Sequence, residues 1–160
     1  YFGSFSTVVR DIIPLYTVLS KENFRSVIIG NGDVEITPTD NLKVMPRATV
    51  SVVREYEEDT RILACICNKL PSNKKETGLI PGKAYHYGAT DKTVLMIGAS
   101  PEVEAFLKKY NRFVFVPNDP QQIKDTISDI LGKPVVKEQP LTEVEPICAA
   151  KRLIETVNSL

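Results

Sequence analysis

Short apolar runs alternate along the chain with stretches in which apolar residues recur at helical spacing. The run Arg61–Asn68, RILACICN, is apolar almost throughout, as expected of a strand that is covered on both faces. Thr93–Ile97 and Arg112–Val116 have the same character, and the turn Gly30-Asn31-Gly32 ends another run. The predicted strands are Tyr1–Phe2, Phe24–Ile29, Asn41–Met45, Arg61–Asn68, Thr93–Ile97 and Arg112–Val116.

Amphipathic segments between these runs predict helices. In Asp11–Lys21 a proline at position 14 is tolerated only in the first turn, so Asp11 is the expected N-cap. In Thr49–Asp59, β-branched residues disfavour a helix, but the length of the segment and its three glutamates favour one. The other predicted helices are a short one opened by Pro81, Pro101–Tyr110 after Ser100, Pro120–Leu131 with Gly132 just past its end, and Pro146–Val157 after a capping box at Thr142 and Glu145.

This alternation predicts a Rossmann-like α/β domain of three layers, α/β/α, with a six-stranded parallel sheet. The common strand order 3-2-1-4-5-6 would make the first and fourth strands neighbours, with a ligand crevice beyond their carboxyl ends. Residues 1–133 would form this Rossmann-like domain. Residues 134–160 would be a linker and a last helix, which packs on the domain or towards a part of the protein outside this sequence.

Composition excludes several classes of protein. The chain has 160 residues, 20 basic and 20 acidic, without a basic cluster, so nucleic acid is not an expected partner. No apolar run approaches the roughly 20 residues of a membrane span. Cys65, Cys67 and Cys148 have no metal-ligand spacing, which indicates no metal and a reduced, cytoplasmic chain. Tyr1-Phe2-Gly3 looks like the end of a strand, so we expect a piece of a longer protein.

The two loops that would meet at the crevice contain small and basic residues. Small residues let backbone N–H groups approach a diphosphate, and two cations, Arg10 and Lys83, would neutralise its charge. An ordinary pair of turns with solvated basic residues explains the same spacing and stays open. The set comprises Gly3, Ser4, Arg10, Thr77, Gly78, Gly82 and Lys83.

His86, the single histidine, lies one helical turn beyond Lys83. A lone histidine on a helix is more often packed or solvated than catalytic. The Gly30-Asn31-Gly32 turn lacks a third glycine and opens no helix, so it is not a dinucleotide-binding motif.

Two segments resemble the carboxy-terminal half of retaining glycosyltransferases of the GT-B fold, in the GT4-like branch. GSFSTVVRDIIPLYTVLSKENFRSVIIGNGD is similar to the first strand turn, helix and second strand of that half. IPGKAYHYGATDKTVLMIGASPEVEAFLKKYNRFVFVPNDPQQIKDTISDIL resembles the donor-site block, with its Lys-x-x-Glu-Tyr motif and Asn/Asp-Asp-Pro turn. The similarity extends to about Leu131.

The resemblance implies a role for each matching position. Gly3 and Ser4 would lie beside the diphosphate, with Arg10 as a phosphate ligand and the N–H groups of Leu79 and Ile80 as donors. Arg47 and Ala48 would line the base. Gly78 and His86 stand where the family has its paired glutamates, which contact the donor sugar and the ribose. Glu76 is the candidate to replace the first of these, and His86 and Glu76 are the catalytic candidates.

The function implied is the donor-binding half of a glycosyltransferase that transfers a sugar from a nucleotide sugar to a glycan or lipid-linked acceptor, in surface polysaccharide synthesis. Its partners would be the nucleotide-sugar donor and the missing amino-terminal acceptor domain, with neither metal nor cofactor. Peripheral membrane contact of the longer, cytoplasmic protein stays open. The alternatives are half of a nucleotide-sugar epimerase of the same fold and a non-catalytic nucleotide-binding module.

Overall fold

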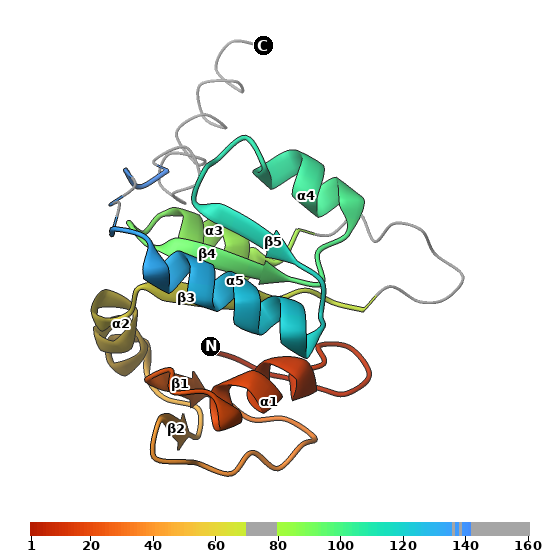
Figure 1. Ribbon diagram of the computed structural model, residues 1–160, viewed down its shortest axis with the longest axis vertical. Coiled ribbons are helices and arrows are strands. Elements are labelled where there is room, and N and C mark those ends of the chain that lie inside the picture. Colours follow the sequence, from red (N-terminus) through yellow and green to blue (C-terminus); the bar gives the residue numbers. More distant parts are fainter. Residues whose placement is uncertain (70–79, 136, 138, 142–160) are drawn as a thin grey trace, which may run out of the picture.

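A computed structural model describes residues 1–69, 80–135, 137 and 139–141 as a mixed α/β structure (Figure 1). Helices and strands alternate much as predicted, whereas the predicted helix Pro146–Val157 lies outside the described residues. The elements are α1 (Ile13–Lys21), β1 (Ser26–Ile29), β2 (Leu42–Met45), α2 (Val50–Asp59), β3 (Ile62–Ile66), α3 (Gly82–Gly88), β4 (Thr93–Ile97), α4 (Pro101–Leu107), β5 (Phe113–Val116) and α5 (Pro120–Gly132).

The strands form two parallel sheets. β1 pairs with β2, and β4 pairs with β3 on one side and β5 on the other. The first two residues run beside β1: the Tyr1 nitrogen donates to the Val27 carbonyl at 2.8 Å, and Phe2 forms a parallel bridge with Ile29. Every pairing observed agrees with the expected strand order.

One continuous six-stranded sheet is not observed among the described residues. Tyr1 and Phe2 contribute only an isolated bridge, and no ladder joins them to β3. A pocket of about 130 Å³ is lined by Phe2, Ile62 and Ala64. The parallel α/β class is therefore confirmed, whereas the strands of the described residues form sheets of two and three strands.

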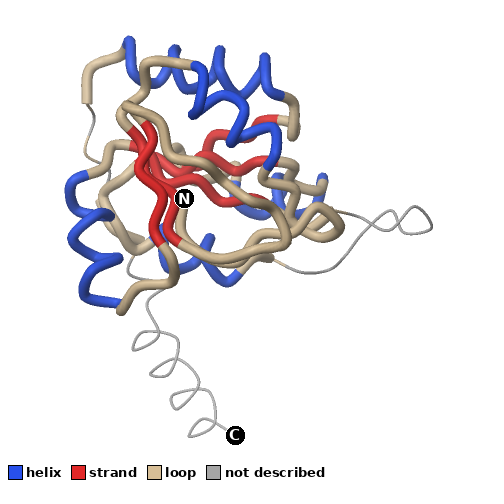
Figure 2. Tube along the Cα trace, turned by 90° about the horizontal axis from the view of Figure 1, so that it is seen from below, coloured by secondary structure: helices blue, strands red, loops and turns tan. Residues whose placement is uncertain are grey.

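Helices cover both faces of the strands, as Figure 2 shows from below. Successive side chains of a strand point to opposite faces. In β4, accordingly, Leu95 and Ile97 join a core formed with α1 and α5, whereas Val94 and Met96 join a second core formed with α3 and α4. This alternation places the strands as a layer between helices.

Two helix starts differ from the prediction. Asp11 is not the N-cap of α1, because Ile12 occupies that position with helical backbone angles. The Asp11 carboxylate still accepts a hydrogen bond from the Ile13 N–H at 3.1 Å, so it satisfies one free donor from just outside the helix. Pro81 is the N-cap of α3 and not its first residue, since its ψ of 130° is extended.

Two helix ends also differ. Gly132 is the last residue of α5 and not the residue beyond it, because the chain leaves in an extended conformation at Lys133 and needs no left-handed residue. Arg61 satisfies the free carbonyls instead, donating to Leu131 at 3.0 Å and also to Ile130 and Lys133. α4 ends at Leu107, three residues before the predicted Tyr110.

Hydrogen bonds also hold Gln139 and Leu141 at the amino ends of the strands. The buried Arg112 guanidinium donates to the carbonyls of Thr90 and Gln139, and the Leu141 N–H donates to the Gly88 carbonyl at 3.0 Å. No helix in the described ranges is long and apolar enough to cross a membrane.

Two glycines allow the first segment and β1 to approach closely at their carboxyl ends. A Cβ atom on Gly30 would lie 1.9 Å from the Gly3 carbonyl oxygen, and the Gly30 φ of 158° is itself unusual for other residues. Gly132, by contrast, has nothing within 4 Å of its Cβ position.

Gly30→Ala should therefore destabilise the fold by about 1–3 kcal/mol, the usual cost of overpacking, because the added methyl group meets backbone that cannot rotate away. Gly132→Ala is the matched control and should stabilise α5 by about 0.5–1 kcal/mol. Urea unfolding followed by circular dichroism measures both. Equal effects of the two substitutions would contradict the close approach.

Candidate functional site

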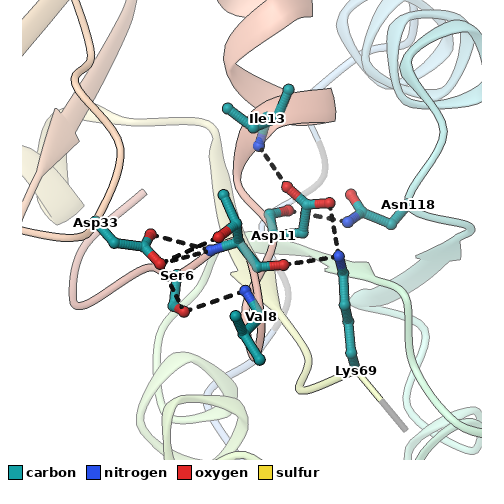
Figure 3. A network of polar contacts seen from close by, with 8 residues as sticks. Ser6, Val8, Asp11, Ile13, Asp33, Lys69 and Asn118 are labelled. Atoms are coloured by element: carbon teal, nitrogen blue, oxygen red, sulfur yellow. Dashed lines mark hydrogen bonds and ion pairs between the residues drawn. The ribbon is translucent and has the colours of Figure 1, made fainter. Parts of the chain in front are cut away.

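A small hairpin loop follows the first segment at the carboxyl edge of the strands. Ser6 and Arg10 exchange backbone hydrogen bonds of 3.0 and 2.9 Å, which closes the loop. On one side the Asp33 carboxylate accepts hydrogen bonds from the Thr7 N–H at 3.0 Å and from the Ser6 hydroxyl at 3.1 Å (Figure 3). The Thr7 N–H is the main cause that lowers the pKa of Asp33 below its ordinary value.

The other side of the loop is held by Lys69, which follows β3. Its ammonium donates to the Thr7 carbonyl at 2.8 Å and pairs with Asp11 at 2.9 Å (Figure 3). The Asn118 amide, after β5, donates to the Asp11 carbonyl at 2.9 Å. Residues that follow three different strands thus hold this loop, so its conformation is fixed by the fold itself.

The Lys83 ammonium lies directly over Gly3. A Cβ atom on Gly3 would be 2.1 Å from Lys83 Nζ, so the glycine provides the space that the lysine occupies. The ammonium also lies 4.6 Å from the centre of the Tyr1 ring, a cation–π contact. Burial is the main cause that lowers the Lys83 pKa below its ordinary value, with a smaller contribution from Arg10.

Two arginines approach the same loop. Arg47 Nη2 donates to the Ser4 hydroxyl at 2.7 Å, and Arg10 Nε donates to the Asn68 side chain at 2.8 Å. Neither arginine forms a salt bridge among the described residues. The turn at Gly3 therefore lies beside two cations, Lys83 and Arg47, an arrangement suited to an anion.

The predicted residues line two pockets on this edge. A pocket of about 440 Å³ between α2 and α3 is lined by Gly3, Arg47, Ala48, Lys83 and His86. A smaller pocket of about 170 Å³ is lined by Arg10 and Ile80, together with Pro81 and Gly82. Arg10 and Ile80 thus share one pocket, whereas Gly3 and Lys83 line the other, so the single crevice that was expected is divided in two. Glu76, Thr77, Gly78 and Leu79 lie outside the described residues.

Glu57 is a residue of the larger pocket that the sequence analysis missed. It is 5% exposed, and its two carboxylate oxygens lie 2.9 and 3.1 Å from His86 Nε2. An ionised carboxylate only accepts hydrogen bonds, so Nε2 carries the hydrogen and Nδ1 is left as an acceptor in the neutral ring. The signal in the sequence is that Glu57 continues the stripe of Val50 and Val53 at helical spacing.

Tyr87 adds a buried hydroxyl to the same pocket. The residue is 1% exposed, and its hydroxyl makes no hydrogen bond of ordinary geometry to any described residue, although the nearby Phe2 backbone slightly lowers its pKa. Burial dominates and raises the Tyr87 pKa well above its ordinary value. A buried hydroxyl without a hydrogen-bond partner is energetically costly.

The site offers cations, amide groups and one carboxylate–imidazole pair. Within the described residues no group of three or more His, Cys, Asp or Glu side chains lies close enough together to hold a metal ion.

Comparison with known proteins adds no family: no family model, curated protein or solved structure matches the chain.

The lysine over Gly3 should titrate at a lower pH than free lysine, because burial disfavours its charged form. Lys124 is the internal control, since its hydrogen bond with Glu22 raises its pKa. NMR titration of lysine side-chain signals, assigned with Lys83→Arg and Lys124→Arg variants, measures both. Titration of Lys83 at or above Lys124 would contradict the buried position.

Proposed function

We propose that the chain is the donor-binding half of a glycosyltransferase of the GT-B fold, which transfers a sugar from a nucleotide sugar to a glycan or lipid-linked acceptor. The observation that carries the proposal is the Lys83 ammonium over Gly3, with Arg47 bound to the adjacent Ser4. A Rossmann-like sheet of order 3-2-1-4-5-6 is part of the proposal.

The two pockets divide the donor between them. The diphosphate extends from Gly3 and Lys83 in the larger pocket to Arg10 in the smaller one. The nucleoside occupies the larger pocket, with its base beside Arg47 and Ala48 and its ribose beside His86. Three cations without a bound metal are enough to neutralise a diphosphate, so neither metal nor cofactor is required.

Glu57 supplies a carboxylate to the ribose end of the pocket. The resemblance leads us to expect a glutamate at position 86, where this chain has a histidine. The Glu57–His86 pair offers a carboxylate acceptor and an imidazole Nδ1 acceptor, both of which suit sugar hydroxyl groups. The acceptor domain, surface polysaccharide synthesis and a cytoplasmic location with peripheral membrane contact belong to the proposal for the longer protein.

A nucleotide-sugar epimerase is the second candidate, and the Glu57–His86 pair favours it. An epimerase needs acid and base groups in the cleft, and a hydrogen-bonded carboxylate and imidazole can fill both roles. The two candidates share donor binding and differ in the product that they form.

Donor binding is tested by isothermal titration of the chain with UDP, dTDP, GDP and ADP. Lys83→Met keeps the apolar stem but removes the charge, and should weaken the preferred nucleotide about 10- to 150-fold, from the loss of about 1.5–3 kcal/mol of charge-assisted contact. Lys21→Met, at the exposed end of α1, should leave affinity unchanged. No binding of any nucleoside diphosphate would overturn the proposal.

The two enzymatic candidates are separated by incubating the full-length protein with the nucleotide sugar that it binds. Epimerisation should proceed without an acceptor and should exchange a sugar C–H hydrogen with deuterium from heavy water. Glycosyl transfer should leave the sugar carbons unexchanged and require an acceptor. If the sugar takes up deuterium and the Glu57→Gln substitution abolishes this uptake, the protein is an epimerase and the glycosyltransferase proposal is overturned.

A further inference from the structure

The Lys83 side chain lines the larger pocket without an acidic partner. Lys83 forms no salt bridge among the described residues, and its ammonium lies over Gly3, 4.6 Å from the centre of the Tyr1 ring. The residue is half-buried, and burial lowers its pKa, which increases the fraction of neutral amine. An amine that is partly removed from water and has no counterion can act as a nucleophile.

The acidic residue in the lining of this pocket is engaged with another group. Glu57 is the only carboxylate among the described residues that line the pocket, and both its oxygens lie within 3.1 Å of His86 Nε2. It forms no salt bridge with Lys83. The charge of the Lys83 amine is therefore not fixed by an ion pair inside the pocket.

Arg47 places a second cation beside the amine. Its Nη2 donates to the Ser4 hydroxyl at 2.7 Å, and Ser4 directly follows Gly3, over which Lys83 lies. Successive Cα atoms are about 3.8 Å apart, so one turn holds both cations on neighbouring residues. A guanidinium has several N–H donors, and those that Ser4 does not use can bind phosphoryl oxygens. A phosphoryl group on Arg47 would thus lie next to the Lys83 amine.

Several other lysines are held as ammonium groups by a carboxylate. Lys69 pairs with Asp11, Lys124 with Glu22, and Lys133 with Asp129. A paired lysine gives up its proton less readily, because the neighbouring negative charge favours the charged form. The chain therefore contains its own comparison for the reactivity of Lys83.

We propose that Lys83 is an acylation site: an acyl phosphate enters the larger pocket, its phosphate binds Arg47, and its acyl group is transferred to the Lys83 amine. The product is a neutral amide over Gly3, and inorganic phosphate leaves. The further consequence, that acylation prevents binding of the nucleotide-sugar donor, rests on the function proposed above.

The reaction needs no third reactant. The neutral amine attacks the carbonyl carbon and forms a C–N bond, and the bond between that carbon and the phosphate oxygen breaks. The phosphate leaves with the bonding electrons and takes up the proton that the amine loses, so it departs as hydrogen phosphate. Nothing is oxidised or reduced. Arg47 stabilises the negative charge that develops on the leaving phosphate.

Acetyl phosphate tests the site, with peptide mass spectrometry to locate the acetyl groups. In the folded chain at neutral pH, we expect Lys83 to be acetylated faster than the paired Lys124 and Lys133 and faster than the exposed Lys21. In urea that unfolds the chain, the four lysines should react at similar rates. A Lys83 that stays unmodified in the folded chain, or that reacts no faster than Lys21, overturns the proposal.

A charged and a neutral acetylating reagent test the role of Arg47. Arg47→Gln should slow acetylation of Lys83 by acetyl phosphate about fivefold, as expected from the loss of one nearby charge, and should leave the rate with neutral N-acetoxysuccinimide unchanged. Arg47→Lys should restore the acetyl phosphate rate. Arg25→Gln, which removes an exposed guanidinium outside the pocket, should change neither rate. Equal slowing of both reagents by Arg47→Gln indicates a merely structural effect and overturns the role of Arg47.

Inorganic phosphate and nucleoside diphosphates separate this inference from the proposed function. Phosphate at about ten times its Kd should slow acetylation of Lys83 by acetyl phosphate about tenfold, because about a tenth of the pockets stay empty. An unchanged rate overturns phosphate binding beside Lys83. If phosphate slows the reaction but UDP, dTDP, GDP and ADP do not, the acylation site is retained and the donor-binding proposal is overturned.

Discussion

The close approach of the Gly3 and Gly30 backbones is the constraint on which the rest of this structure depends. A side chain on Gly30 would meet the Gly3 carbonyl, and the Gly3 φ of 125° is one that other residues rarely adopt. The contact ties the first segment to β1 and, at the same point, brings a buried ammonium onto the backbone. The absence of side chains at Gly3 and Gly30 therefore determines both how the first segment packs on β1 and where the Lys83 ammonium lies.

Positive charges are in excess at the candidate site, although the chain as a whole has no net charge. Arg10, Arg47 and Lys83 bind neutral oxygens or an aromatic ring, while the nearby acidic groups are engaged elsewhere: Asp11 with Lys69, and Glu57 with His86. The positive field is thus left for a ligand.

Much of the fold follows from the sequence because the apolar runs that become strands are continuous and few other structures fit them. Helix ends were predicted less well. Gly132 has the identity of a residue beyond a helix, yet Arg61, 71 residues away along the chain, satisfies the carbonyls there, and only tertiary structure brings the two together. Pro81 similarly has an extended backbone, with a ψ of 130°, and so precedes the helix that its identity would have started.

Some residues of the candidate site could likewise be predicted from the sequence and others could not. Gly3, Arg10 and Lys83 could be grouped from strand order alone, because the carboxyl ends of parallel strands meet at one edge. Glu57 could not, since its partner His86 is 29 residues away and a glutamate in a helix ordinarily faces solvent. Its place on a stripe of valines was the one local sign of burial. Arg47 and Ser4 are 43 residues apart in the chain, so their contact likewise could not be predicted from the local sequence.

The guanidinium groups of Arg61 and Arg112 give the two edges of the strands different mechanical roles. Both bind carbonyls of the chain that leaves α5, at the amino ends of the strands, far along the strands from the glycine turn. A pull on the chain beyond residue 141 would load these two arginines before it strained any strand. Tension along the chain would therefore be taken up at the amino ends of the strands, away from the candidate site, and the loop held by Asp33 and Lys69 would keep its shape.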